Sequence, residues 1–465
     1  MSTRPPETAP WSVPLAHSAP TAAIAPAAAA RIPWGFAEVF VISQTALPAL
    51  LYLPGTQPFR LPIRFSAFAI SLMALAWHQL EPSSPPRSRT QPWVAAVLAL
   101  LGVMLFHPQT VTLTAGVAQI GVYLAVIAPL FWAPRFVRSP EQMARLFWLL
   151  LLCSGANAVV GVLQVYDPGR WLPQEFSRVV TQSTLGLGAV TYTGANGQQI
   201  VRPPGLFDTP GAVAGPAMFA ALLGLIFTVS PVAAWKRVLS LALAGCGFAA
   251  IYLSQVRISL VVAVLMLVVY ALALLRQGRG ARFSQFTLLA VGVVVFSFSL
   301  ALTLGGASIS ERFHSLFADD PIAVYQKARG AQLQYTFSEM LYEYPFGAGL
   351  GRWGMTSGYF GFANPNVPPI WAEIQFTGWM IDGGVLMIAL YLGALAATAR
   401  SQFRLTRSER YPRLATCAAV VLAAELGPAA MIVSFTPFVA QIGIQYWFLA
   451  GALHGLACRY GQQDA

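Results

Sequence analysis

Apolar residues fall into long runs along almost the whole chain, and short polar segments separate these runs. A run of about 17 to 25 apolar residues has the length of a helix that crosses a hydrocarbon core of about 30 Å. The pattern predicts about twelve such helices. They cover residues 36–53, 64–80, 92–106, 113–133, 143–165, 210–230, 238–254, 258–275, 286–304, 374–397, 414–435 and 441–457. The run 92–106 is also short enough to be a re-entrant segment.

The basic residues favour twelve crossings with both termini in the cytoplasm. Cytoplasmic loops of membrane proteins carry an excess of Lys and Arg. In this arrangement the inner loops contain Arg87, Arg135, Arg276 and a cluster of arginines over residues 400–413. The two long loops, residues 166–209 and 305–370, are then expected on the opposite, periplasmic face.

Composition agrees with a polytopic membrane protein of all-α class. Of the 465 residues, 56% are hydrophobic and only 10% are charged, whereas about a quarter of the residues of a soluble domain are charged. We expect one transmembrane domain over residues 36–458, a disordered Pro/Ala-rich cytoplasmic tail over 1–35, and a short tail over 459–465. The net charge of +11 comes largely from inner arginines that meet anionic lipids, so no nucleic-acid partner is expected.

Two short motifs at outer helix ends carry candidate ligand-binding arginines. Arg202 begins the segment Arg-Pro-Pro-Gly-Leu-Phe-Asp-Thr-Pro-Gly, whose Pro and Gly residues fix a non-helical backbone and hold Arg202 and Asp208 at the membrane face. Arg257 lies in the tight turn Ser-Gln-Val-Arg-Ile-Ser, where an arginine is costly unless it is paired or faces a polar cavity. Both arginines also have an interpretation without a ligand. In it, Arg202 pairs with Asp208, and the Arg257 side chain extends to the outer surface.

The loop 305–370 contains the largest set of polar and aromatic residues. Residues 325–344 are good helix formers, and they predict a surface helix that ends at Pro345. The following run Pro-Phe-Gly-Ala-Gly-Leu-Gly indicates a tight turn, because no strand precedes it as in a nucleotide site. Candidate ligand-binding arginines in the loop are Arg312, Arg329 and Arg352. Aromatic residues that are suited to stacking on sugars, or to an interfacial belt, are Tyr335, Trp353, Tyr359 and Trp371.

Several carboxylates lie in or near the predicted spans. Glu373 is at the outer mouth of span 374–397, and Asp382 lies about two turns deeper. An unpaired carboxylate at that depth is costly, so Asp382 is either functional or bonded to a neighbouring helix. Glu38 and Glu425 are intramembrane acids outside any motif. The acids and cysteines lack the spacing of metal ligands, and no metal is expected.

Taken together, the order of these motifs resembles that of the O-antigen ligase and O-antigen polymerase superfamily of bacterial inner-membrane glycosyltransferases. The resemblance implies a GT-C-like fold with short helices in the large periplasmic loop. It also implies transfer of a glycan from undecaprenyl diphosphate to a sugar acceptor, with inversion and without metal or other cofactor. The implied partners are the lipid-linked glycan donor, an acceptor that is a lipid-linked repeat unit or lipid A core, and a chain-length regulator.

One departure from the family favours a polymerase. Ligases of this family usually carry a histidine where the large loop returns to the membrane, but here residues 368–373 read Pro-Pro-Ile-Trp-Ala-Glu, and the loop's histidine is His314. A polymerase of O-antigen or exopolysaccharide, with Glu373 in the acceptor position, therefore fits better. The alternatives are a ligase that transfers polymer to lipid A core and, from another class, a polysaccharide or lipid transporter or flippase.

The residue types suit this chemistry. A diphosphate leaving group gains negative charge in the transition state, and fixed guanidinium groups stabilise that charge with bidentate hydrogen bonds. We expect Arg202, Arg257 and Arg329 to bind the diphosphate, with Arg312 and Arg352 as further candidates. Glu373, or as second choice Asp208, is expected to orient or deprotonate the acceptor hydroxyl, because a carboxylate in a low-dielectric mouth has a raised pKa.

Overall fold

The structure is a computed structural model of the whole chain. It describes residues 33–80, 87–173, 191–193, 197, 199–207, 209–305, 323, 325–361 and 363–460. The chain divides into two units, Met1–Trp34 and Gly35–Ala465, and the description below concerns the second unit. The predicted tails over residues 1–35 and 459–465 lie mostly outside the described residues.

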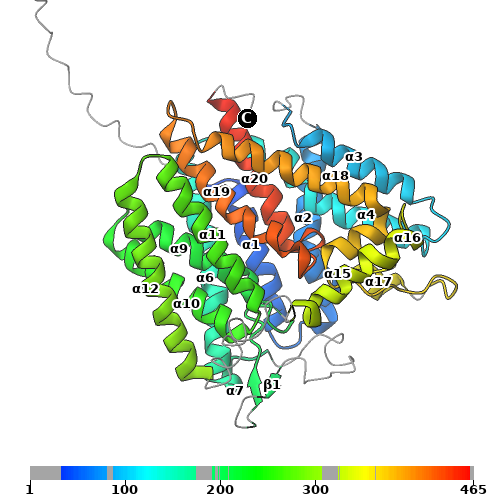
Figure 1. Cartoon of the computed structure of the whole chain (residues 1–465), viewed down its shortest axis with the longest axis horizontal. Coiled ribbons are helices and arrows are strands. Elements are labelled where there is room, and N and C mark those ends of the chain that lie inside the picture. Colours follow the sequence, from blue (N-terminus) through cyan, green and yellow to red (C-terminus); the bar gives the residue numbers. More distant parts are fainter. Residues whose placement is uncertain are drawn as a thin grey trace, which may run out of the picture. The chain divides into compact units, whose positions relative to one another are not determined.

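Long helices build the second unit, and each coincides with a predicted span (Figure 1). They are α1 (Phe36–Ala49), α2 (Arg60–Leu80), α3 (Gln91–Met104), α4 (Leu113–Ile127), α5 (Pro129–Phe136), α6 (Pro140–Tyr166), α9 (Ala214–Thr228), α10 (Ala234–Ser254), α11 (Arg257–Arg276), α12 (Gly280–Gly305), α18 (Gln375–Leu405), α19 (Pro412–Ala430) and α20 (Gln441–Arg459). The predicted span 113–133 corresponds to α4 and α5 together.

Short elements connect the long helices. They are the 3-10 helices η1 (Leu50–Tyr52), η2 (Gln57–Phe59), η6 (Met431–Val433) and η7 (Pro437–Val439), and the short helices α7 (Pro168–Trp171), α15 (Ala331–Tyr335), α16 (Leu341–Glu343) and α17 (Gly354–Phe360). The π-helical stretches η4 (Gln326–Gly330) and η5 (Thr336–Met340) flank α15, so the helical conformation predicted over 325–344 is confirmed. An antiparallel hairpin joins β1 (Thr191–Thr193) to β2 (Gln199–Val201). In Figure 1, α7 and β1 lie at the bottom of the helix bundle, and the C-terminal end of α20 lies at the top.

The chain is a helical, polytopic membrane protein. Within the described residues, eight helical segments are long and apolar enough to cross a membrane. They are Arg60–Leu80, Leu113–Phe136, Pro140–Tyr166, Ala234–Ser254, Arg257–Arg276, Gly280–Leu304, Gln375–Leu405 and Pro412–Val433. Three further predicted spans are shorter apolar helices, Phe36–Tyr52, Gln91–Met104 and Ala214–Thr228. The last predicted span is α20, whose Gln441, Gln445 and His454 make it less apolar.

Small residues let the central helices pack closely. A Cβ atom at Gly224 of α9 would lie 2.6 Å from the backbone of α10, and one at Gly247 of α10 would lie 2.8 Å from the backbone of α9. Gly451 and Gly455 of α20 approach the backbone of α5 in the same way, at 2.6 and 2.4 Å. Helices in lipid associate through such packing, because burial from lipid gives little hydrophobic gain. The close contacts between α9 and α10 and between α5 and α20 therefore stabilise the bundle.

Helix α18 is broken at Gly383–Gly384, where Gly384 has φ +64° and ψ −154°. The long loop satisfies backbone groups on both sides of the break. The carbonyl of Ile381 accepts a hydrogen bond from the N–H of Ala348 at 2.7 Å, and the N–H of Val385 donates to the carbonyl of Pro345 at 3.0 Å. Unpaired backbone groups are costly in a hydrocarbon environment, so the break and the loop depend on each other.

The glycine run of the long loop is a close-packed turn, as the sequence indicates. Gly347, Gly349 and Gly351 all have positive φ. A Cβ atom at Gly349 would lie 2.3 Å from the carbonyl oxygen of Gln109, which precedes α4. The glycines thus allow the loop backbone to pass directly against neighbouring backbone.

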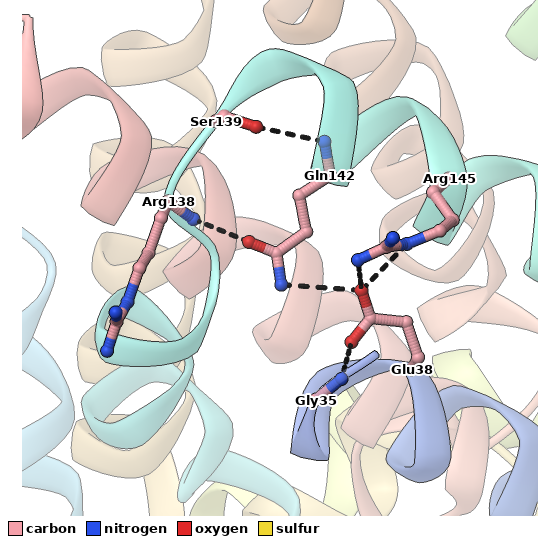
Figure 2. Close-up of polar contacts among 6 residues, drawn as sticks. All are labelled: Gly35, Glu38, Arg138, Ser139, Gln142 and Arg145. Carbon is pink, nitrogen blue, oxygen red and sulfur yellow. Dashed lines mark hydrogen bonds and ion pairs between the residues drawn. The ribbon is translucent and has the colours of Figure 1, made fainter. Parts of the chain in front are cut away.

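A buried ion pair joins α1 to α6 (Figure 2). The Glu38 side chain is fully buried, and its carboxylate accepts from the Nε of Arg145 at 2.9 Å and from the N–H of Gly35 at 2.9 Å. The amide of Gln142 donates to the same carboxylate at 3.4 Å. Glu38, which belongs to no recognisable motif, is therefore a structural residue that fixes the start of α1 against the start of α6.

We predict that Gly384→Ala destabilises the protein by about 1–3 kcal/mol, because only glycine adopts this backbone conformation readily. In addition, the new Cβ would lie 2.0 Å from the carbonyl oxygen of Pro345. Thermal unfolding of the detergent-solubilised protein measures the effect. Gly292→Ala is the control, since a Cβ there meets nothing within 4 Å. Equal unfolding temperatures for the two variants would contradict this account of the break.

We also predict that Arg145→Met is strongly destabilising, because it leaves the Glu38 carboxylate buried without its cation. Loss of one partner of a buried pair costs about 3–5 kcal/mol, and the lower end applies because the Arg145 side chain is 23% exposed. The matched control is Arg413→Met, which removes the surface pair with Glu141 and should cost less than about 1 kcal/mol. Denaturant unfolding of the two variants compares them directly, and a similar loss in both would show that burial of the pair is unimportant.

Candidate functional site

Three of the predicted diphosphate-binding arginines and the predicted base Glu373 lie on separate segments of the chain. Arg202 follows β2 and precedes α9, and Arg257 begins α11 directly after α10 ends. Arg329 lies in η4 of the long loop, and Glu373 lies two residues before the start of α18. Segments that are far apart in sequence therefore supply this part of the site.

The Arg202 segment is held in a fixed, non-helical shape. The side chain of Gln164, on α6, accepts from the N–H of Gly205 and donates to its carbonyl, both at 2.8 Å. Gly205 and Gly211 have positive φ, and the N–H of Gly211 donates to the carbonyl of Arg202 at 3.4 Å. Sequence reasoning missed Gln164, although a glutamine inside a predicted span is itself a signal of a polar role.

The two arginine motifs pack against each other. A Cβ atom built on Gly211 would lie 3.5 Å from Nη2 of Arg202 and 3.3 Å from Cγ2 of Val256. The Arg202 guanidinium is therefore next to the turn that carries Arg257. The turn itself is tight, because Gln255 adopts the left-handed conformation at φ +57°.

Buried N–H donors at this point lack partners within the described residues. They are Nε of Arg202, Nε of Arg257 and Nε2 of Gln255. A buried donor that forms no hydrogen bond costs about 1–3 kcal/mol, and more when it is charged. An anion is the acceptor that suits two arginines.

Arg329 and Glu373 form an ion pair beside Arg202. Burial lowers the pKa of Arg329, and the positive charge of Arg202 lowers it further. Burial also lowers the pKa of Arg202. Arginine stays protonated despite such shifts, so the two neighbouring cations repel each other, and a bound anion would relieve that repulsion.

Gln332 connects the surface helix to the mouth of α18. Its Oε1 accepts from the N–H groups of Glu373 and Ile374 at 2.9 and 3.1 Å, and its Nε2 donates to the carbonyl of Trp371 at 3.0 Å. The hydroxyls of Thr336 and Thr377 also join the two segments, at 2.7 Å. No sequence motif marks Gln332, because its partners are backbone groups that only the fold brings near.

Glu373 is partly accessible and is paired in the structure. Its side chain is 30% exposed, and its carboxylate forms an ion pair with Arg329. An acceptor hydroxyl can therefore reach this carboxylate only where it is not occupied by Arg329.

Arg352 lies in a separate network and has structural partners. Its guanidinium is buried and donates to the carbonyls of Ala348 and Pro368 at 2.9 and 3.1 Å, and to Oε1 of Gln109 at 2.9 Å. It thus ties the glycine run to the return segment of the loop and to the α3–α4 connection. The structure does not bring Arg352 into contact with Arg202 or Arg329 in this arrangement.

Trp353 is a core residue in the structure, in contrast to the prediction that it stacks on glycan. It is 1% exposed, and its Nε1 donates to Oδ2 of Asp382 at 2.8 Å. The same oxygen accepts from the hydroxyl of Tyr123 at 2.7 Å and from Nε2 of Gln119 at 3.1 Å. Asp382 therefore fits the second of its two interpretations, in which it bonds to neighbouring segments. Its carboxylate holds α4, α18 and the loop together.

The other predicted glycan-binding aromatics are accessible. Tyr335, Tyr359 and Trp371 are 38%, 47% and 76% exposed. Trp371 and Tyr335 lie on the two segments that Gln332 joins, so both are near Glu373. Tyr359 packs instead beside Phe65 of α2, with ring centroids 6.1 Å apart.

Asp208, Arg312 and His314 lie outside the described residues, and so does the predicted pair between Asp208 and Arg202. Among the described residues, no three His, Cys, Asp or Glu side chains gather as metal ligands would.

No protein-family model and no curated protein sequence matches the chain.

We predict that Asp382→Leu is much less stable than Asp382→Asn. Leucine leaves three buried donors without an acceptor, at about 1–3 kcal/mol for each, whereas asparagine keeps one carbonyl oxygen in place. Denaturant unfolding in detergent measures both variants against the parent protein. Equal stability of the two variants would mean that the donors find other partners and that Asp382 does not organise this contact.

Proposed function

We propose that this protein is a membrane glycosyltransferase of the O-antigen polymerase type. It would join undecaprenyl-diphosphate-linked oligosaccharide repeat units into a cell-surface polysaccharide, on the periplasmic face of a bacterial inner membrane, with both chain termini in the cytoplasm. The observation that carries this proposal is the convergence of Arg202, Arg329 and Glu373, from separate segments, next to the turn of Arg257. A GT-C-like fold of about twelve spans belongs to the same proposal.

The reaction makes one bond and breaks one. The acceptor hydroxyl attacks the anomeric carbon of the donor glycan, the bond from that carbon to the diphosphate oxygen breaks, and the configuration inverts. Negative charge then grows on the leaving diphosphate. The guanidinium groups of Arg202, Arg257 and Arg329 would stabilise this charge in a partly desolvated site, where such contacts are strong.

The Arg329–Glu373 ion pair suggests how donor binding prepares the base. A bound diphosphate competes with the carboxylate for Arg329, because it carries more charge and offers more acceptor oxygens. Once released, Glu373 is free to accept a hydrogen bond or the proton from the acceptor hydroxyl. Trp371 and Tyr335, exposed beside Glu373, would contact the apolar faces of the glycan.

We predict that Arg202→Ala and Arg257→Ala each slow polymerisation about 100-fold or more, as loss of one charge-stabilising donor typically does. Arg257→Lys should recover little activity, since lysine cannot form the bidentate contact. Glu373→Gln should also slow the reaction about 100-fold or more. The assay incubates protein in liposomes with undecaprenyl-diphosphate-linked repeat units and resolves the products on a gel, with and without lipid A core.

Arg170→Ala is the control, because Arg170 is an exposed arginine on α7 and should leave activity unchanged. A ladder of products without lipid A core supports the polymerase. Label on lipid A core alone would indicate the ligase instead, and the argument from Glu373 would be wrong. If competent substrate yields no new glycosidic bond under either condition, the proposal fails in favour of transport.

A further inference from the structure

A cavity lies away from the arginine site. It has a volume of about 860 Å³ and is formed by α11, α18, α19 and α20, which is within the range of about 300–1,000 Å³ typical of ligand pockets. Its wall is mainly aliphatic, and includes Leu272, Leu392, Leu395, Leu422, Leu426 and Ile432. The size and lining suit a hydrocarbon chain.

Cations stand at one end of this cavity. Arg276, at the C-terminal end of α11, lines it together with Phe403 of α18. The guanidinium carbon of Arg276 is 4.1 Å from the centroid of the Phe403 ring, and that of Arg407 is 5.5 Å from the same centroid. Within the described residues, neither arginine forms an ion pair with a carboxylate. Two cations on one ring without a counter-ion favour an anionic ligand.

A buried polar group also lines the cavity. Gln402 and Glu425 are each 3% exposed, and the Nε2 of Gln402 donates to Oε2 of Glu425 at 2.6 Å. Tyr446 of the cavity wall is a further neighbour of the Glu425 carboxylate, whereas Oε1 of Gln402 has no hydrogen-bond partner in the part of the chain that the structure describes. Because Gln402 lines the cavity, a ligand with a hydroxyl group would satisfy this oxygen.

We propose that this cavity binds an anionic phospholipid whose headgroup carries hydroxyl groups. Its phosphate contacts Arg276 and Arg407, its hydrocarbon chain lies along the leucines, and its hydroxyl donates to Oε1 of Gln402. The lipid would bridge α11, α18 and α19. This site is independent of the proposed glycosyl transfer, because Arg257 and Arg276 occupy opposite ends of α11, about 30 Å apart by helix geometry.

Native mass spectrometry of the full chain in detergent tests the proposal, with phosphatidylglycerol and phosphatidylcholine as probes of matched chain length. The parent protein should retain phosphatidylglycerol preferentially. The double variant Arg276→Gln/Arg407→Gln should weaken its binding about tenfold or more. The matched control is Arg400→Gln/Arg404→Gln, which removes exposed cations of α18 outside the cavity lining and should leave binding unchanged.

A second variant tests the hydrocarbon part of the site. Ala399→Trp fills the cavity that Ala399 lines, and it should abolish labelling of α18 and α19 by a phosphatidylglycerol with a photoreactive acyl chain. Leu386→Trp, at an exposed position of α18 outside the cavity, should label normally, so loss of labelling only in the first variant supports the site. Equal labelling in both variants would overturn the proposal. So would equal retention of the two lipids, or full competition by millimolar inorganic phosphate alone.

Discussion

The structure depends on one constraint, which is that backbone polar groups inside a hydrocarbon layer must find partners within the protein. Helix α18 breaks at Gly383–Gly384, and the long loop supplies the missing partners through Pro345 and Ala348. A loop that carries polar and charged residues is thereby held close against the bundle. The helix break is thus the anchor of the candidate site, although it makes no contact with a ligand in the proposed reaction.

From that anchor the loop extends in two directions. Toward its N-terminal side, η4, α15 and η5 lie over the mouth of α18, where Gln332 bonds to the backbone of Glu373 and Thr336 bonds to Thr377. Toward its C-terminal side, Arg352 and Trp353 fix the return segment, through Gln109 and Asp382. These contacts place Arg329 beside Glu373 and Arg202, and so convert residues from distant segments into one group of charges.

The charged side chains in and beside the bundle differ in how many of their polar atoms form hydrogen bonds or ion pairs within the protein. Glu38 is paired with Arg145, and Oδ2 of Asp382 accepts three hydrogen bonds while its Oδ1 has no partner among the described residues. These contacts of the two acids stabilise helix packing. The Nε atoms of Arg202 and Arg257 are buried without partners among the described residues. A charge that the fold satisfies is explained by stability, whereas donors without an acceptor among the described residues are candidates for contact with an anion.

The sequence by itself determined the class of the protein and the positions of its helices, because the length and apolarity of a segment decide whether it is helical in a membrane. It also marked Arg202, Arg257, Arg329 and Glu373, since charged residues at helix ends are conspicuous in such a chain. Only the tertiary structure decided which of these charges meet. It assigned Trp353 and Arg352 to structural contacts and showed the part of Gln332, because their partners lie on distant segments or are backbone groups without a sequence signature.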